Sequence, residues 1–170
     1  PTDPQSATLL EPDTDLGARF DQPQFCTPAA TLAVATRTLD GALAEAGAAR
    51  VDYLKLDVEG AEGEVLDAAP ATLATVVLAK IEVAFVAARK GQPLARDIAA
   101  RMDRAGFELL DLIRPAHWRR HGHVIDPLSD AGAPLPYSRG QLIHGDYLFL
   151  RRAETIKDAA QARRAAWLAM

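Results

Sequence analysis

The sequence predicts an α/β fold: a mostly parallel sheet with helical crossovers between its strands and a final antiparallel strand. Apolar, β-branched segments at 51–58, 76–86 and 107–113 are separated by spacers long enough for helices. A fourth segment, 146–150, follows after about 30 residues without a helical pattern. This last strand can therefore pair antiparallel with the third, with the long connection lying over the carboxyl edge of the sheet.

Bulk composition narrows the class of protein. The 170 residues are 49% hydrophobic and 25% charged, which suits one globular domain. With a net charge of −4 and little aromatic interleaving among its basic residues, the chain is not expected to bind nucleic acid. The single cysteine, Cys26, rules out an internal disulfide. No apolar run spans a bilayer and no leader pattern opens the chain, so we expect a cytoplasmic protein without a membrane partner.

The first part of the chain carries few periodic signals. Residues 1–30 hold five of the eleven prolines, so we expect 1–36 to be an irregular segment in which only 7–10 is strand-like. Thr38 then precedes an alanine-rich stretch that ends at Gly47, which predicts a short, capped helix.

The segment 51–58 is the first predicted strand. Side chains alternate between the faces of a strand, so Lys55, Asp57 and Glu59 are expected on one face. Gly60 breaks the strand, and acidic residues then open a helix over 59–69, where the helix dipole favours them.

The second strand, 76–86, repeats this pattern, since Lys80 and Glu82 share one of its faces. A helix is predicted from Pro93 to Ala105, followed by the strand 107–113. Residues 153–170 are alanine-rich and predict a terminal helix.

If the first two strands are neighbours, ionisable side chains gather on one side of the sheet. Ionisable groups there cost free energy unless they are paired or line a cleft, and open α/β sheets bind ligands at the carboxyl ends of their strands. The same residues can equally form a structural network in which lysines neutralise carboxylates, and both interpretations stay open. The residues concerned are Lys55, Asp57, Glu59, Lys80 and Glu82.

Several motifs together resemble the signature of FkbM-type S-adenosylmethionine-dependent methyltransferases. That family has a Rossmann-like sheet and usually methylates hydroxyl groups of small molecules or sugars. The resemblance implies S-adenosylmethionine as cofactor and a methyltransferase domain over 37–152. It rests on Thr38-Leu39-Asp40, the run Val51–Glu62 with its Lys-x-Asp-x-Glu-Gly-x-Glu core, Ile81-Glu82-Val83, Gly106–Leu112, Arg139–Leu142 and Gly145–Arg151.

The resemblance also implies roles for individual residues. Asp57 and Glu59 would lie beside the methyl-transfer cleft, as a general base or as the ligand of the cofactor's ammonium group, with Gly60 also at the cofactor. Lys55 would keep Asp57 ionised, although a purely structural ion pair is the simpler interpretation. Glu82 is expected to contact the substrate, and it too has an equally simple structural role.

One part of the family pattern is missing. Such enzymes hold their cofactor with a glycine-rich loop, and this sequence has no Gly-x-Gly run. We therefore expect the chain to be the carboxyl-terminal half of the domain, inactive as an isolated fragment. The alternative is a non-catalytic α/β module that acts in interactions.

A histidine-rich stretch lies on the long connection before the last strand. His117, His121 and His123 match no common metal motif, and we expect a substrate-facing loop without a metal. Trp118 and Arg119 are candidates for holding a planar or anionic substrate, and His144 for facing the same cleft. A hydrolase that uses a divalent metal held by Asp57, Glu59 and Glu82 is the least favoured alternative.

Overall fold

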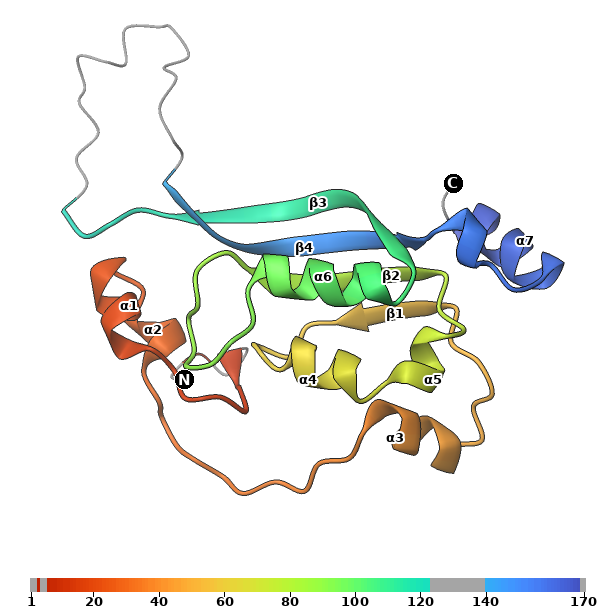
Figure 1. Ribbon diagram of the computed structural model, residues 1–170. Coiled ribbons are helices and arrows are strands. Elements are labelled where there is room, and N and C mark those ends of the chain that lie inside the picture. Colours follow the sequence, from red (N-terminus) through yellow and green to blue (C-terminus); the bar gives the residue numbers. More distant parts are fainter. Residues whose placement is uncertain (1–2, 4–5, 123–139, 169–170) are drawn as a thin grey trace, which may run out of the picture.

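The computed structural model describes residue 3, residues 6–122 and residues 140–168. One sheet runs through the described part of the molecule, with its four strands in the order β1-β2-β4-β3 (Figure 1). β3 and β4 are longer than the sequence predicts. The strands are Tyr53–Leu56 (β1), Leu78–Ala84 (β2), Phe107–Trp118 (β3) and Gln141–Arg151 (β4).

Strand pairing confirms part of the predicted topology. β1 and β2 are adjacent and parallel, with Lys55 opposite Lys80, and the last strand pairs antiparallel with β3. The expectation of mostly parallel pairing is not confirmed. β4 inserts antiparallel between β2 and β3, which run in the same direction, so β1–β2 is the single parallel pair among the described strands.

Helices connect and flank the strands. None of the described helices is long and apolar enough to cross a membrane. The helix expected at 59–69 begins only at Glu62, and Pro70 starts a further helix. The helices after the N-terminal segment are Leu39–Glu45 (α3), Glu62–Asp67 (α4), Pro70–Leu73 (α5), Ala95–Arg104 (α6) and Ala159–Leu168 (α7), the last preceded by a 3-10 turn at Ala153–Thr155.

The N-terminal segment is more ordered than its composition predicts. It contains two short helices, Thr14–Arg19 (α1) and Pro23–Cys26 (α2), while the strand-like stretch 7–10 forms no strand. The carboxylate of Asp13 caps α1 by accepting a hydrogen bond from the Leu16 N–H at 3.0 Å. Pro23 occupies the first turn of α2, where a missing N–H costs nothing. A proline therefore begins a helix in this segment, whereas the high proline content predicted irregular structure.

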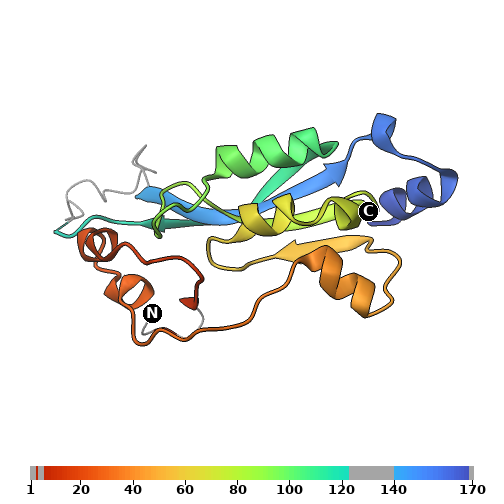
Figure 2. The ribbon, with the colours of Figure 1, turned by 60° about the horizontal axis from the view of Figure 1, so that its bottom comes forward.

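The main core lies between the sheet and the layer formed by α4, α5 and α6, which cover one face (Figure 2). Ile98 and Met102 of α6 are fully buried there against Ile81 and Phe149 of the central strands. The alternation of β2, apolar toward the helices and polar on the other side, follows from this one-sided cover.

The Thr38-Leu39-Asp40 motif joins two helices. The Thr38 hydroxyl accepts a hydrogen bond from the Gly41 N–H at 3.1 Å and caps α3. The Asp40 carboxylate accepts hydrogen bonds from the N–H groups of Ala71 and Thr72 at 2.9 and 2.8 Å, at the start of α5. The bond from the Thr72 hydroxyl is the main cause that lowers the pKa of Asp40. The motif thus caps two helices, α3 through Thr38 and α5 through Asp40, and so places α3 against α5.

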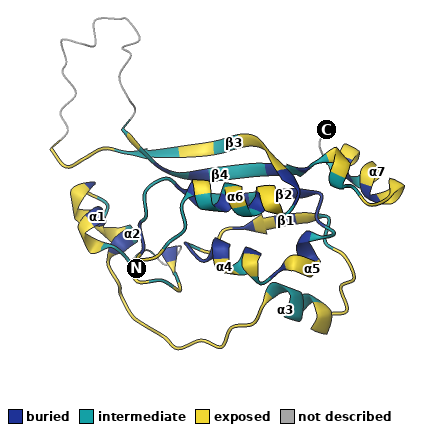
Figure 3. Cartoon of the chain, in the orientation of Figure 1, coloured by how far each residue is buried: buried dark blue, intermediate teal, exposed yellow. Residues whose placement is uncertain are grey.

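The open side of the sheet is polar. The Lys80 ammonium lies 2.8 Å from the Asp146 carboxylate on this side, and Glu82 is the register partner of Asp146. β1 forms one edge of the described sheet, and residues 27–38 run as an exposed, extended stretch (Figure 3). α1 and α2 lie at the end of the sheet where β1 and β2 have their carboxyl termini (Figure 1).

Candidate functional site

The turn between β1 and α4 is organised by one buried carboxylate. Glu62, only 4% exposed, accepts hydrogen bonds from the Val58 N–H at 2.9 Å and from the Gly60 N–H at 3.0 Å. These two bonds hold Glu59 and Gly60 with φ angles of 56° and 107°. Burial raises the pKa of Glu62, while the backbone hydrogen bonds oppose that rise. The predicted role of Glu62 as an acid at the helix start is therefore extended: it shapes the turn that carries Glu59.

Gly60 fits this turn for a steric reason as well. A Cβ atom at this position would lie 3.0 Å from Cδ of Arg89 and 3.2 Å from Cδ1 of Leu10, in a backbone conformation that L residues rarely adopt. The glycine thus lets Arg89 pack directly over the turn. Its contact with a cofactor stays a prediction.

Strand alternation explains only part of the acidic cluster. β1 ends at Leu56, and Lys55 Nζ lies 2.7 Å from Asp57 Oδ2 on the exposed side. Glu59 lies beyond the strand, so the expectation that it continues the strand face is wrong. It reaches the same region because the left-handed turn redirects its side chain.

Three carboxylates meet at the carboxyl ends of β1 and β2. Asp57, Glu59 and Glu82 each offer an oxygen atom, and these atoms all lie within 4.8 Å of one another. Each has its own cationic or ionisable partner: Lys55 for Asp57 at 2.7 Å, Arg89 for Glu59, and His144 Nδ1 for Glu82 at 3.1 Å. Each carboxylate of the cluster thus has a side-chain partner within the described residues.

Glu59 is the most perturbed of these acids. Its pKa is raised to about 7, with burial as the largest cause; the charge of Arg89 opposes this rise, and the neighbouring carboxylates contribute to it. Its side chain is 22% exposed, whereas that of Asp57 is 41% exposed. The ionised form of Glu59 is thus disfavoured in this structure, and an additional positive charge nearby would stabilise it.

A cavity of about 130 Å³ opens beside Glu59. Arg89 is 8% exposed, and its Nε is a buried donor with no hydrogen-bond partner in the described part of the chain. The side-chain contact with Glu82 raises the pKa of His144. The cavity is lined by Ser6, Phe25, Glu59, Glu62, Glu82, Val83, Ala84, Val86, Ala88, Arg89, Gln92, Trp118, Ile143 and His144.

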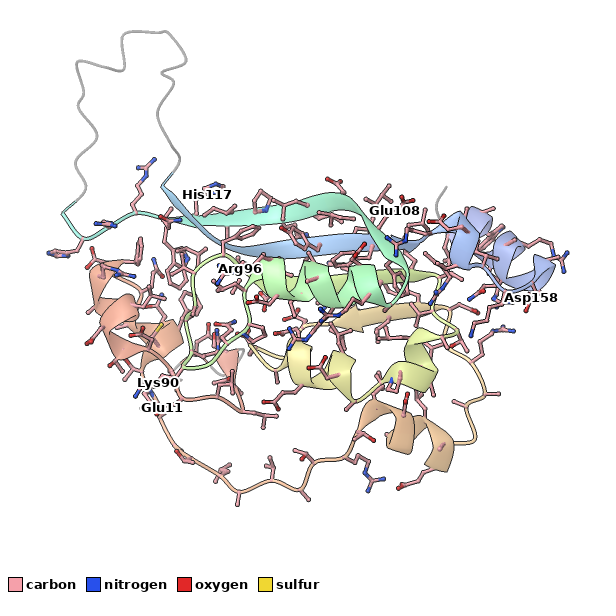
Figure 4. The ribbon with its side chains drawn as sticks, viewed as in Figure 1. Glu11, Lys90, Arg96, Glu108, His117 and Asp158 are labelled. Atoms are coloured by element: carbon pink, nitrogen blue, oxygen red, sulfur yellow. The ribbon has the colours of Figure 1, made fainter. Side chains whose placement is uncertain are left out.

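The N-terminal segment closes one side of this cavity. The ring of Phe25 stacks on Trp118 with 5.8 Å between centroids and 17° between planes. The Thr8 hydroxyl donates to the Glu59 carbonyl at 2.7 Å, which ties the segment to the turn. Glu11 and Lys90 pair at 2.6 Å and lie together at the same end of the molecule (Figure 4). The segment is therefore part of the site.

The structure brings together some of the predicted site residues. Glu59, Glu82, Trp118 and His144 line the cavity, while Lys55 and Asp57 form an ion pair at its rim and Gly60 shapes the turn. Arg119 is exposed and does not line the cavity; it lines a separate groove with Asp21, and Trp118 borders both. One ring face of Trp118 is covered by Phe25, so stacking of a planar substrate there is obstructed.

Residues from outside the motifs complete the lining. Ser6, Phe25, Arg89 and Gln92 were not predicted, since they lie in the proline-rich segment and in the loop after β2. The one available signal was the position of Arg89 shortly after a predicted strand, at the edge where ligands bind.

The histidine-rich stretch does not gather at the site. His117 lies on β3 (Figure 4), and His121 Nδ1 lies 2.6 Å from Asp21 Oδ1. His123 lies outside the described residues. Neither His117 nor His121 lines the cavity.

A family model described as a methyltransferase FkbM domain matches residues 5–109, more than half of the chain. The chain belongs to the FkbM methyltransferase family. No curated protein and no solved structure matches it. The FkbM match includes the N-terminal segment that closes the cavity, which the sequence motifs had placed outside the domain. It ends at residue 109, so β4 and His144 lie beyond it.

Replacement of Glu62 tests the role of the turn. Glu62→Gln keeps one acceptor but places an amide NH₂ beside the backbone N–H groups, so we expect it to lower the free energy of unfolding by about 1–3 kcal/mol. Glu64→Gln, at an exposed position of the same helix, should change it by less than about 0.5 kcal/mol. Urea unfolding of both variants measures this. Equal stability of the two would show that the Glu62 contacts do not hold the turn.

The pKa of Glu59 predicts a pH dependence of stability. An acid whose folded pKa is raised binds its proton more tightly in the native state, so its ionisation destabilises the fold as pH rises from its unfolded pKa to about 7. Relative to the native protein, Glu59→Gln should therefore gain about 1–2 kcal/mol in unfolding free energy between about pH 4 and pH 8. Urea unfolding at a series of pH values gives this difference. A difference that stays constant with pH would contradict the raised pKa.

Proposed function

We propose that this chain provides the acceptor side of an S-adenosylmethionine-dependent O-methyltransferase, acting on a hydroxyl group of a small molecule or sugar. Membership of the FkbM family supports methyl transfer. The observation that carries the proposal is the cavity at the carboxyl ends of β1 and β2, where Glu59, Glu82 and His144 converge. Ligands of open α/β sheets bind at this edge.

The charge of this edge suits the cofactor. S-adenosylmethionine supplies a methyl group on a cationic sulfur, and it also carries an ammonium group. Asp57, Glu59 and Glu82 present clustered carboxylates, and the raised pKa of Glu59 marks a place where added positive charge is favourable. We propose that Asp57 and Glu59 hold the ammonium group, which extends the role that the motif implies.

The size of the cavity limits what it can hold. Pockets that enclose ligands of drug size measure roughly 300–1,000 Å³, whereas this cavity measures about 130 Å³. The described residues therefore fit the reacting end of a ligand and leave the rest of the cofactor to another surface. This agrees with the absence of a Gly-x-Gly run from the sequence. We propose that a glycine-rich loop from outside these 170 residues completes the cofactor site.

The main task of these residues is positioning. Methyl transfer requires the acceptor oxygen, the methyl carbon and the sulfur to be aligned, and alignment lowers the barrier without a covalent intermediate on the protein. Glu62 fixes the turn and Arg89 fixes the Glu59 carboxylate through their ion pair. Lys55 keeps the Asp57 carboxylate in place at the rim, and the contact with Asp57 raises the pKa of Lys55.

A second candidate function is a non-catalytic α/β module. The observation that favours it is the position of β1 at the edge of the described sheet. One side of β1 pairs with β2, and the backbone groups on its other side pair with no described strand and are available to another polypeptide. Such a module would bind a partner through this edge and would not need the cavity.

Cofactor binding separates the two functions. We expect the 170-residue chain to bind S-adenosylmethionine weakly or not at all, because the loop that approaches the cofactor is missing from the sequence. A polypeptide that carries a glycine-rich loop and its strands ahead of this chain should bind it with at least about tenfold higher affinity. Calorimetric titration of both proteins measures this. Equal, weak binding by both would favour the non-catalytic module.

Charge-removing variants test the site in that longer polypeptide. Asp57→Asn and Glu59→Gln should each lower kcat/KM about 10²-fold or more, since they remove the charge that holds the ammonium group and so position the cofactor. Neither should lower the melting temperature by more than a few degrees. Glu64→Gln, on the exposed face of α4, is the matched control and should retain activity. Full activity of the two site variants would mean that the acidic cluster is structural.

A further inference from the structure

Two polar groups that line the cavity have complementary hydrogen-bonding needs. The Arg89 guanidinium is held through Nη2 by the Glu59 carboxylate, which leaves Nε as a buried donor without a partner in the described part of the chain. Arg89 lines the cavity and is 8% exposed. A buried donor without a partner is unfavourable, so an acceptor atom in the cavity would be stabilised once a small shift of the Arg89 side chain makes Nε accessible to it.

His144 offers a hydrogen-bond acceptor, whereas Arg89 offers a donor. Its Nδ1 lies 3.1 Å from Glu82 Oε1, which fixes the ring and leaves Nε2 as the nitrogen available to a ligand. When Nδ1–H donates to the carboxylate of Glu82, Nε2 of the neutral ring is an acceptor. A His–carboxylate pair of this kind is a common arrangement for taking a proton from a hydroxyl group.

A hydroxyl group is the ligand that satisfies both residues, since its oxygen accepts one hydrogen bond and its proton donates another. We propose that Arg89 Nε and His144 Nε2 hold the methyl-acceptor hydroxyl between them, and that His144, positioned by Glu82, takes its proton. This inference rests on the proposed methyl transfer and adds the residues that hold the acceptor hydroxyl and the group that takes its proton. The cavity's apolar wall, formed by Val83, Ala84, Val86, Ala88 and Ile143, suits the carbon that bears the hydroxyl.

The atoms and charges of the step balance. The acceptor oxygen forms a bond to the methyl carbon, and the sulfur–carbon bond breaks with its electron pair going to sulfur. The hydroxyl proton passes to Nε2 of His144, which becomes an imidazolium beside the Glu82 carboxylate and later releases the proton to solvent. Arg89 donates to the oxygen before the transfer. Its ion pair with Glu59 holds the guanidinium in place.

The charges around His144 set the direction of its pH dependence. Glu82 on β2, Glu59 in the turn and Asp146 on β4 face the ring, and they raise its pKa, with the contact to Glu82 the largest cause. Lys80 is occupied by Asp146 at 2.8 Å. The neutral ring that accepts a hydroxyl proton therefore prevails only above this raised pKa, and hydroxyl binding should strengthen as pH rises through it.

Nuclear magnetic resonance of the labelled 170-residue chain tests the inference with glycerol as the probe. We expect glycerol to shift the Arg89 Nε–H and His144 ring signals together and to saturate. Its affinity should be roughly threefold or more higher at about pH 8 than at about pH 6. In His144→Gln this pH dependence should be smaller than in the wild-type chain, although Glu59, with a pKa of about 7, still titrates beside Arg89. Arg89→Lys should weaken binding. His121→Gln replaces an exposed histidine outside the cavity and is the control.

Each outcome decides the inference. It is overturned if the two signals do not respond to glycerol in a protein whose amide spectrum shows that it is folded. It is equally overturned if they respond without saturation like those of His121, or if the pH dependence is unchanged in His144→Gln. If His144→Gln fails to fold, Glu82→Gln takes its place in the experiment, because it should lower the pKa of His144 without removing the ring. The assay contains no S-adenosylmethionine, so a failure of the proposed methyl transfer leaves its result unaffected.

Discussion

The candidate site depends on the buried carboxylate of Glu62, which binds the backbone of the turn after β1. The two hydrogen bonds that this side chain accepts from backbone N–H groups compensate part of the cost of burying it and hold Glu59 and Gly60 in left-handed conformations. Without this turn, the chain at Glu59 would continue in the direction of the strand, and its side chain would not meet Arg89. The Lys-x-Asp-x-Glu-Gly-x-Glu motif can be understood in these terms: its last acid shapes the backbone that presents the earlier ones.

The site also shows how like charges are kept together. Asp57, Glu59 and Glu82 converge although their mutual repulsion and burial disfavour ionisation, most of all for Glu59. Their partners come from separate places, since Lys55 lies on β1, Arg89 in the loop after β2 and His144 on β4. Each carboxylate therefore meets its partner only when these three elements are assembled in the folded sheet.

The N-terminal segment links the fold to the site. Its aromatic side chain Phe25 packs on Trp118, and Thr8 bonds to the turn at Glu59. The family match that begins at residue 5 agrees with this arrangement. Leu16 and Phe20 of the segment form a second, small hydrophobic cluster together with Ala88 and Ile143. The proline-rich N-terminal segment thus covers one side of the cavity.

The sequence by itself determined the strands, most helices after the N-terminal segment and the family of the protein. Apolar periodicity identified each strand, the motifs identified the family, and alternation placed Lys80 and Glu82 on one face of β2, because these properties depend on neighbours along the chain. Only the tertiary structure decided that β4 inserts between β2 and β3 and that Arg89 reaches Glu59 from 30 positions away. It also decided that Arg119 lies outside the cavity. Such facts depend on long-range packing and on a left-handed turn, and neither leaves a periodic signal in the sequence.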